Sequence, residues 1–321
     1  MLAVAALVTS ACGSGDTASG SAKDTVTVSQ GVDVSTLDPQ MGTGTMTDMS
    51  VLSNIFDFLT KVDDDGQVQP ELATSWKPVG DGSKWQFDLR HDVTFQNGEP
   101  FNAEAVKFTF DRLNDPETHS PLSAGGLMTG VKVVDDDTVE FSLAYPDPYL
   151  PSQLSLFIGA IIPPKYVTEK GAEYFAENPV GTGPFSFVSW KRGDRVTLKA
   201  NDTYWGEVPK IDNLVFRNIP NAADAAAALR AGEIDVNSNI DADTAAEFKG
   251  DSKIDVRAVP GVRTFMLSLD ADQGGPLENV KVRQAINHAV DMDTIVATLK
   301  GATPSAPPPR CRARARRSTP R

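Results

Sequence analysis

The stretch Pro70–Leu113, PELATSWKPVGDGSKWQFDLRHDVTFQNGEPFNAEAVKFTFDRL, contains three successive signals of local structure. Apolar and polar residues alternate from Trp85 to Arg90, which predicts a β-strand with one buried face. Asn97-Gly98 predicts a turn. Asn102 predicts the start of a helix, because its side chain can accept a hydrogen bond from the first helical turn. The stretch therefore predicts a strand, a turn and an amphipathic helix. The apolar stripe of this helix consists of Val106, Phe110 and Leu113.

Three hairpins are predicted from turn residues between short apolar strands. Asp63–Gly66 and Asp135–Asp137 are interpreted as hairpin turns, since they lack the ligand spacing and distal glutamate of a calcium loop. The third hairpin would join Phe185–Trp190 to Arg195–Lys199 around Arg192-Gly193-Asp194.

A βαβ unit is predicted after this hairpin. Leu214–Ile219 and Ile234–Val236 are its strands, and Ala222–Ala231 is its helix, which Asn221 begins and Gly232 ends. Hairpins combined with a βαβ unit predict a mixed α/β architecture.

The other expected elements lie toward the two ends of the chain. Val51–Leu59 and Val280–Leu299 are expected to be helical, the latter as one or two helices, and Thr264–Leu269 alternates as a strand. Val26–Val28 is expected to be extended, and Met41–Met49 is expected to be a loop rich in Gly, Thr and Met.

Composition excludes several classes of function. The 321-residue chain carries 43 acidic and 30 basic residues, for a net charge of −13. This balance argues against a nucleic-acid partner, because phosphate binders need clustered Lys and Arg. Cys12 and Cys311 lie near the two ends, so no buried disulfide framework is expected. With only three scattered histidines, no metal site and no cofactor are predicted.

The N-terminal segment predicts export. Leu2–Val8 is an uninterrupted apolar run, too short to span a bilayer but suited to the core of a signal peptide. The small residues before Cys12 resemble a bacterial lipobox, which implies that Cys12 is lipidated. Gly13–Lys23 is a polar, flexible linker. We therefore expect a signal peptide over residues 1–11 and a lipidated tether over residues 12–24.

No catalytic spacing stands out. Gly42-x-Gly44 lacks the third glycine of a dinucleotide loop, and Gly181-x-Gly183 continues into Pro184 rather than into a helix. The chain contains neither a Gly-Lys-Ser/Thr phosphate loop nor a Gly-x-Ser-x-Gly elbow. Because carboxylates are plentiful, a secreted hydrolase with an unrecognised carboxylate pair stays open as an alternative function.

Several sequence blocks together carry a family resemblance. They are LDP (37–39), ELATSW (71–76), WQFDLR (85–90), VTFQNGEPFNAEAV (93–106), VGTGPF (180–185), NDTYW (201–205) and VRQAI (282–286), followed by Asp291. In this order they resemble the extracytoplasmic solute-binding proteins of family 5, which serve peptide and nickel ABC importers. The resemblance extends from about Val26 to about Lys300. It implies a class II (cluster C) periplasmic-binding-protein-like fold and no enzymatic activity.

The resemblance also implies a domain organisation. A main α/β region of the first lobe, residues 25–46 and 181–262, would carry an inserted subdomain, residues 47–180. Residues 263–300 would be the start of a second lobe that is largely missing. Residues 301–321 contain six Arg, five Pro and four Ala but no acidic residue, and we interpret them as the product of a reading-frame shift. The chain is thus interpreted as a C-terminally truncated family member.

The implied role is capture of a peptide or a similar small solute outside the membrane. The implied partners are the solute, the ABC permease subunits and a lipid anchor at the outer face of the cell membrane, and the protein would be a monomer. Gly42, Thr43, Thr45 and Met46, after the first strand, would line the cleft, with hydroxyls for hydrogen bonds and Met46 for adaptable apolar contact. The alternatives are that this stretch is a plain loop and that the chain is a non-functional fragment.

Two further expectations concern the aromatic and basic residues. The four tryptophans, Trp76, Trp85, Trp190 and Trp205, are expected to be core residues rather than ligand platforms. Arg283 is expected to anchor its helix rather than to contact ligand. The sequence does not name the solute, which could be a peptide, a nickel chelate or a sugar.

Overall fold

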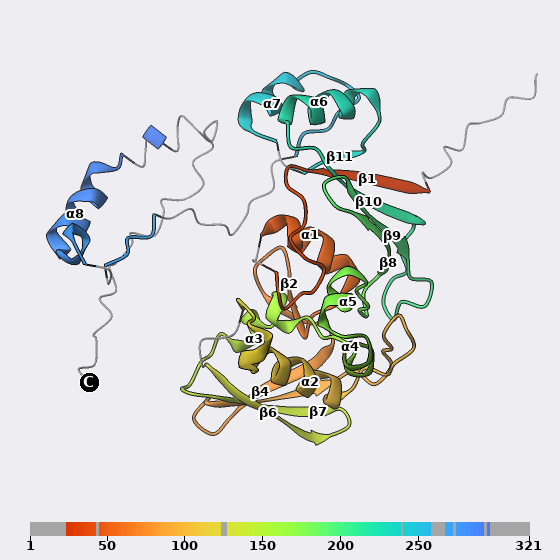
Figure 1. Cartoon of the computed structure of the whole chain (residues 1–321), viewed down its shortest axis with the longest axis vertical. Helices are drawn as coiled ribbons and strands as arrows, with labels where there is room; N and C mark the ends of the chain where they lie inside the picture. Colours follow the sequence, from red (N-terminus) through yellow and green to blue (C-terminus); the bar gives the residue numbers. More distant parts are fainter. Residues whose placement is uncertain are drawn as a thin grey trace, which may run out of the picture. The chain divides into compact units, whose positions relative to one another are not determined.

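The chain forms two compact units (Figure 1). The computed structural model describes residues 24–42, 45–122, 127–238, 240–257, 267–271, 274–291 and 294–295. The first unit comprises the chain up to Ile219 together with Ile234–Val236. The second comprises Pro220–Glu233 and the chain from Asn237 onward. The predicted signal peptide, Cys12 and the tail 301–321 lie outside the described residues.

A five-stranded mixed sheet forms one part of the first unit, with the strand order β11-β1-β10-β9-β8. Strands β1 and β10 are parallel, whereas β9 is antiparallel to both of its neighbours. The strands are β1 (Thr25–Gln30), β8 (Phe185–Lys191), β9 (Arg195–Ala200), β10 (Asn213–Asn218) and β11 (Val236–Asn237). The predicted β8–β9 hairpin is confirmed. The predicted strand Ile234–Val236 begins two residues too early, because only Val236 and Asn237 adopt the strand pairing.

Helix α1 (Met46–Ile55) packs against this sheet. The prediction of a helix over Val51–Leu59 is wrong at both ends. Thr45 begins the helix by capping it, and Phe56 ends it in an extended conformation with φ −117°. The prediction of a loop up to Met49 is therefore also wrong from Met46 onward. Residues of the helix and strands share one hydrophobic cluster that contains Val51, Leu52, Ile55, Phe185, Val196, Leu198, Leu214 and Phe216.

A four-stranded antiparallel sheet with the order β4-β5-β7-β6 forms another part of the first unit. Its strands are β4 (Ala73–Val79), β5 (Lys84–Leu89), β6 (Met128–Asp135) and β7 (Thr138–Leu143). Trp85, Phe87 and Leu89 are buried, as the alternation predicts. A separate hairpin pairs β2 (Thr60–Val62) with β3 (Val68–Pro70). Both Asp-rich segments are the hairpin turns that the sequence predicts.

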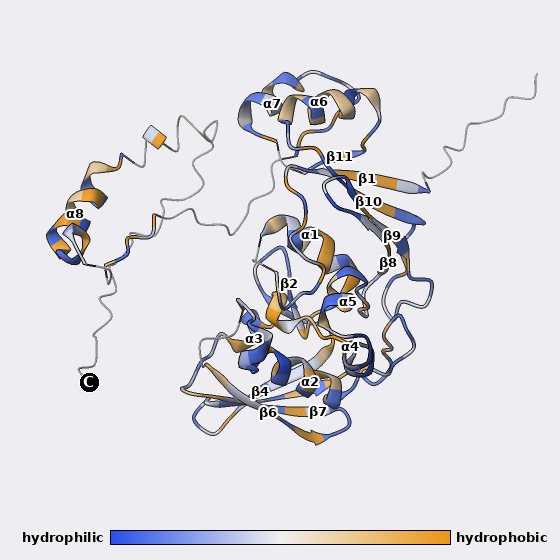
Figure 2. Ribbon diagram, in the orientation of Figure 1, coloured by the Kyte–Doolittle hydropathy of each residue, from blue (hydrophilic) through white to orange (hydrophobic). Residues whose placement is uncertain are grey.

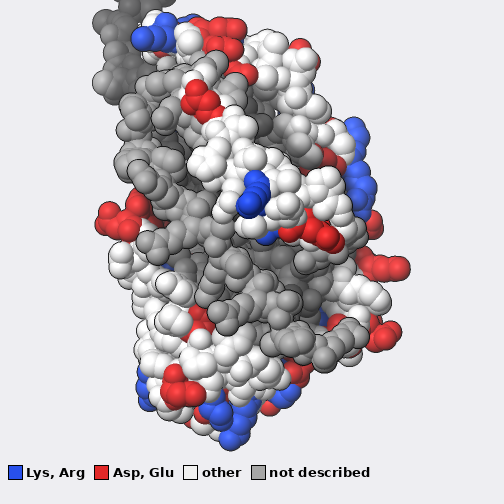
Figure 3. Space-filling model, turned by 90° about the vertical axis from the view of Figure 1, so that its left-hand side faces the viewer, with Lys and Arg blue, Asp and Glu red and all other residues white. Residues whose placement is uncertain are grey.

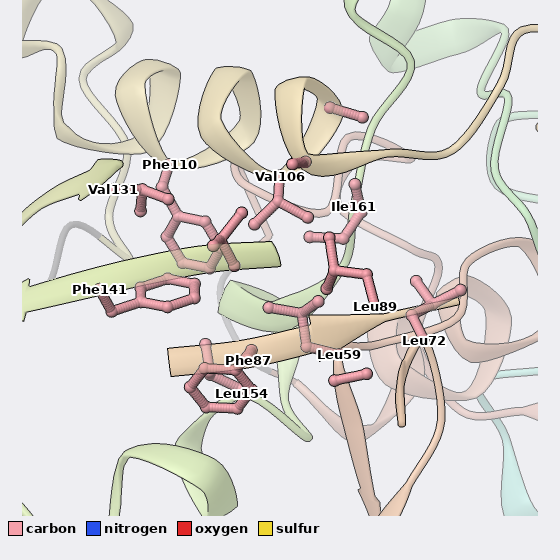
Figure 4. Packing of buried hydrophobic residues seen from close by; sticks show 14 of the residues in the cluster. Leu59, Leu72, Phe87, Leu89, Val106, Phe110, Val131, Phe141, Leu154 and Ile161 are labelled. Carbon is pink, nitrogen blue, oxygen red and sulfur yellow. The ribbon is translucent and has the colours of Figure 1, made fainter. Parts of the chain in front are cut away.

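Helix α2 (Ala103–Asn114) covers the four-stranded sheet (Figure 4). Asn102 is its N-cap, and its side-chain oxygen accepts a hydrogen bond from the N–H of Ala105 at 3.0 Å. The ring of Phe110 on the helix meets that of Phe141 on β7 edge to face, with centroids 4.8 Å apart, and Phe141 meets Phe87 at 5.3 Å. Aromatic contacts of this geometry add about 0.5–1.5 kcal/mol each beyond the burial of their surface.

Short helices connect these layers. They are η1 (Pro116–Thr118), α3 (Leu150–Gln153), η2 (Phe157–Gly159), α4 (Pro164–Lys170) and α5 (Ala172–Glu177). Polar and apolar residues are mixed along most helices and strands, as expected of elements with one buried face (Figure 2). Of the tryptophans, Trp85 is buried, and the other three pack partly buried against the two hydrophobic clusters.

The second unit contains helices α6 (Ala222–Ala231), α7 (Ala242–Glu247) and α8 (Val280–Ala289), with η3 (Pro276–Glu278) before α8. Asn221 caps α6 as predicted, and Gly232 ends it in the left-handed region at φ 73°. Arg230 of α6 forms an ion pair with Glu247 of α7 at 3.2 Å, which ties the two helices together.

One prediction in the second unit agrees with the described residues and another needs correction. Helix α8 ends at Ala289, because Val290 has an extended backbone, and residues 294–295 are helical again, as the alternative of two helices over Val280–Leu299 predicts. The described part of the predicted strand Thr264–Leu269, residues 267–269, is not in a strand. Arg283 donates to the carbonyls of Leu277 and Glu278 at 2.6 and 3.0 Å, so it anchors the start of α8 as expected.

Candidate functional site

The segment between β1 and α1 lies at the carboxyl end of two parallel strands, β1 and β10. This edge is where open α/β sheets bind ligands. Gln30 is the last residue of β1, and its side-chain amide donates to the carbonyl of Thr47 in α1 at 3.4 Å. Two apolar side chains of the segment are exposed, Val32 at 66% and Met46 at 62%. The edge therefore offers apolar surface next to the first turn of a helix.

Three of the four predicted ligand-lining residues can be placed, and Thr43 lies outside the described residues. Gly42 is buried, whereas Thr45 and Met46 are exposed. The hydroxyl oxygen of Thr45 accepts a hydrogen bond from the N–H of Asp48 at 3.1 Å and so caps α1. This cap uses an acceptor position of Thr45 and leaves its O–H as a donor. Thr45 and Met46 are thus accessible, and the ligand-binding role of all four residues stays a prediction.

A buried aspartate, Asp48, and a half-buried one, Asp33, hold the segment between β1 and α1 in place. Asp48 accepts hydrogen bonds from the N–H and the hydroxyl of Ser35, at 2.8 and 2.9 Å. Asp33 accepts from the N–H of Gly193 at the tip of the β8–β9 hairpin at 2.6 Å, and from the indole N–H of Trp190 at 3.4 Å. The segment is therefore fixed to the helix on one side and to the hairpin on the other, which favours a preformed binding edge.

The opposite end of α1 is held by the VGTGPF block. The N–H of Gly183 donates to the carbonyl of Ile55 at 2.9 Å. The side-chain amide of Gln96 donates to the carbonyls of Ile55, Gly183 and Phe185 at 3.3, 3.1 and 2.8 Å. A Cβ atom on Gly181 would lie only 2.1 Å from the carbonyl oxygen of Ile55, so this approach requires glycine. We call the contacts of Gln96, Gly181 and Gly183 with the C-terminal end of α1 the α1 joint.

The NDTYW block completes the α1 joint around a buried carboxylate. Asp57, two residues after α1, is 3% exposed. Its two carboxylate oxygens accept hydrogen bonds from the hydroxyl of Tyr204 at 2.9 Å and from the indole N–H of Trp205 at 2.8 Å. Burial raises the pKa of Asp57, although the bonds from Trp205, Thr182 and Tyr204 each oppose this. The block therefore fixes the chain that leaves α1.

The LDP block forms a second buried polar group. The carboxylate of Asp38 accepts two hydrogen bonds from the guanidinium of Arg112 on α2, at 3.3 and 2.6 Å. Their side chains are only 1% and 11% exposed. The same guanidinium donates to the side-chain oxygen of Gln40, whose amide donates to the carbonyl of Thr109. The segment after β1 is thereby attached to the helix of the four-stranded sheet.

Two surface cavities also lie in the first unit. One of about 520 Å³ lies beside the Asp38–Arg112 pair, and one of about 380 Å³ runs along β8 beside Trp190 and Arg192. Neither cavity is lined by Gly42, Thr45 or Met46.

The described residues show no metal-binding cluster and no membrane-spanning helix that would point to another kind of site. No cluster of three or more His, Cys, Asp or Glu residues suited to a metal occurs among the described residues. Within the same part of the chain, none of the helices has the length and apolar character needed to cross a membrane. On the face drawn in Figure 3, basic side chains form small groups interspersed with acidic ones.

Comparison with known proteins identifies the family. Residues 67–310 match the bacterial extracellular solute-binding proteins, family 5 middle. The chain belongs to this family. This result confirms the resemblance to the family, and the VGTGPF and NDTYW blocks lie within the matched residues. The family consists of transport binding proteins rather than enzymes.

Individual relatives agree with this family assignment. The chain is 34% identical over 263 residues to the dipeptide-binding protein of Escherichia coli strain K12, which covers 75% of this chain and 49% of the relative. It is 31% identical over 279 residues to the glutathione-binding protein GsiB of Salmonella choleraesuis strain SC-B67, with 86% and 53% covered. This family 5 chain thus spans about half the length of the curated relatives it matches.

A solved structure supports the fold class. The structure of NikZ from Campylobacter jejuni in complex with Ni(L-His) is 29% identical, with a TM-score of 0.72, and the match covers 86% of this chain and 55% of the other. The predicted periplasmic-binding-protein-like fold with mixed α/β sheets is therefore confirmed.

Sequence reasoning missed the role of the resemblance-carrying blocks. The sequence analysis assigns Gly181, Gly183 and Tyr204 to family blocks and Trp205 to the core, but the structure shows that these residues also build the α1 joint. One signal for this was present in the sequence, since two glycines spaced by one residue and followed by proline suggest a close backbone approach. No such signal marks Asp57.

Proposed function

We propose that this chain is the solute-binding component of an ABC importer. It captures a peptide or a similar small solute outside the cell membrane and delivers it to the permease subunits. The family match over residues 67–310 carries this proposal. Relatives are named for a dipeptide and for glutathione, and one solved relative holds Ni(L-His), so we propose a class of solutes rather than one compound.

The proposed contacts lie at the edge between β1 and α1. The exposed thioether of Met46 suits apolar groups of varied shape, and the O–H of Thr45 suits an acceptor such as a peptide carbonyl. In the proposed domain organisation, residues 25–46 and 181–262 form the main region of the first lobe. A second lobe would close over the solute from the other side, because binding proteins of this type bind by hinge closure.

A hydrolase is the alternative from a different class, and the carboxylates do not favour it. One pair of acids in the first unit interacts electrostatically, because the negative charge of Asp57 helps to raise the pKa of Glu71. Asp57 is 3% exposed and is covered by the bonds from Tyr204 and Trp205. A substrate cannot reach a carboxylate in this position, so we propose that the chain is not an enzyme.

Solute binding is tested by nuclear magnetic resonance with the 321-residue chain. We expect a mixture of short peptides to shift the backbone amide signals of Gln30, Asp33, Thr45 and Met46. We expect weak affinity, with Kd above about 1 μM, because half a cleft leaves the polar ends of the solute without partners. Gly130 on β6 serves as an internal control whose signal should not move.

Three outcomes would contradict these proposals. Submicromolar binding would show that this chain alone forms a complete site. Signal changes confined to other residues would show that the edge between β1 and α1 is not the site. Cleavage of the peptides would favour the hydrolase, and the same titration with a nickel–histidine complex distinguishes the class of solute.

We further propose that Cys12 anchors the protein at the outer face of the cell membrane. One acyl chain holds a protein only marginally, so stable anchoring requires more than one chain on the cysteine. We expect bacterial cells expressing the wild type to retain the protein in the membrane fraction and cells expressing Cys12→Ser to release it. Equal fractionation of the two proteins would refute the anchor.

A further inference from the structure

The carboxylate of Asp57 has the surroundings of an ionised group. Its partner Trp205 has only an N–H to offer, and an indole N–H can only donate, so the oxygen that it meets must accept. The hydroxyl of Tyr204 donates to the other oxygen. With a donor on each oxygen, the negative charge is stabilised inside the α1 joint.

The carboxylate of Glu71 meets the backbone directly after Asp57 and has fewer described donors than Asp57. The described hydrogen bond to its carboxylate comes from the backbone N–H of Phe58 at 3.1 Å. Phe58 is the residue after Asp57, so one short segment connects the two acids. Burial raises the pKa of Glu71 to about 8, and the negative charge of Asp57 adds to this effect. At neutral pH we therefore expect Glu71 to be protonated and Asp57 to be ionised.

Two cations and a neutral tyrosine are the other titratable groups that the described residues place around the pair. Lys61 on β2 lowers the pKa of both acids. The guanidinium of Arg90 lies over the ring of Trp205 at 4.4 Å and is already paired with Asp92 at 2.8 Å. The pKa of Tyr204 is raised by burial and by Asp57, so its hydroxyl keeps its proton as a donor. Neither cation is bonded to Glu71 by an ion pair that the structure shows.

We propose that Asp57 and Glu71 form a proton-dependent lock on the α1 joint, which holds Tyr204 and Trp205 in place while Glu71 is protonated and loosens when both acids are ionised. Two neighbouring negative charges repel each other in a site that water reaches poorly. The second charge strains the segment Asp57–Phe58 that carries the bonds to Tyr204, Trp205 and Glu71. This lock is independent of the proposed transport function, because it needs no solute.

The structure supplies a separate reporter for each acid. The indole N–H of Trp205 reports on Asp57, and the amide N–H of Phe58 reports on Glu71. The chain has four tryptophans, so Trp205→Phe assigns the indole signal. We expect both signals to shift together between about pH 6.5 and pH 9.5, with a midpoint near 8.

Substitutions separate the pair from other titrating groups. Glu71→Gln should abolish the shift of the Trp205 indole signal, because a neutral amide cannot ionise. Asp57→Asn should move the midpoint at the Phe58 amide to lower pH, because the neighbouring negative charge is removed. Glu140→Gln is the matched control, since Glu140 pairs with Lys84 at the surface and should leave both signals unchanged.

The proposal predicts that the folded chain becomes less stable as the pH rises. The folded pKa of Glu71, about 8, lies above its ordinary value of 4.5. The folded chain therefore binds more protons than the unfolded chain between these values, and stability falls as the pH rises through this window. Between about pH 5 and pH 9, the melting temperature of the wild type should fall by several degrees more than that of Glu71→Gln. The melting temperatures of the two proteins should differ least at about pH 5.

Three results would overturn the lock. The first is a Phe58 amide signal that titrates near 4.5, which would mean that Glu71 is an ordinary surface acid. The second is a Trp205 indole signal that still titrates near pH 8 in Glu71→Gln. The third is a wild-type melting temperature that changes with pH as that of Glu71→Gln does. None of these results bears on solute binding, so failure of the lock leaves the proposed function standing.

Discussion

Gly183→Ala is expected to lower the free energy of unfolding by at least about 3 kcal/mol, or to prevent folding. A Cβ atom at this position would lie 2.7 Å from the carbonyl carbon and oxygen of Ile55 and 2.8 Å from the carbonyl oxygen of Asn54. All three are backbone atoms at the end of α1, so a side-chain rotation cannot relieve the clash. The helix or the strand that follows must move, which breaks the bonds that Gln96 makes across the α1 joint.

The measurement is denaturant-induced unfolding followed by circular dichroism, with Gly130→Ala as the control. Gly130 lies in β6 with ordinary φ and no atom within 4 Å of an added Cβ. Its substitution should change the free energy of unfolding by less than about 1 kcal/mol, since alanine loses less backbone freedom than glycine. If both variants unfold at the same denaturant concentration, the α1 joint tolerates a displaced helix end and its tight packing contributes little to stability.

Local elements were predictable wherever one short pattern determines them. Asn102 precedes an apolar stripe with the helical period, so the start of α2 was correct. The Asp-rich turns were correct because each lies between two alternating strands. The bounds of α1 were wrong because Thr45 and the glycines before it resemble a loop, and its cap bond to Asp48 is visible only in three dimensions.

The candidate site was predictable only as a segment. The edge between β1 and α1 follows from the family resemblance, but the exposure of Met46 and the capping role of Thr45 depend on where α1 begins. The proton-dependent lock could not be predicted. Asp57 meets Tyr204 and Trp205 across 147 and 148 residues of sequence, and no periodicity connects positions so distant. Sequence patterns report local geometry, whereas a buried charge is decided by tertiary burial.

Arg112→Met is expected to lower the free energy of unfolding by about 3–5 kcal/mol, because it leaves the carboxylate of Asp38 buried without its counter-ion. The side chain of Asp38 is 1% exposed. Apart from Arg112, the described donor to its carboxylate is the N–H of Gln40, at 2.9 Å. Methionine keeps most of the volume of the arginine stem, so loss of packing contributes little. The same substitution also removes the bond that holds the side chain of Gln40.

Lys84→Met provides the matched control for this ion pair. Lys84 pairs with Glu140 at 2.7 Å, but its side chain is 50% exposed, so its loss should cost less than about 1 kcal/mol. The double variant Asp38→Asn with Arg112→Met tests the cause. If the cost of Arg112→Met comes from an unpaired buried charge, removing that charge should recover about 2 kcal/mol or more in a double-mutant cycle. Additive losses would mean that Arg112 stabilises the chain by packing, and the attachment of the LDP block to α2 would then not depend on charge.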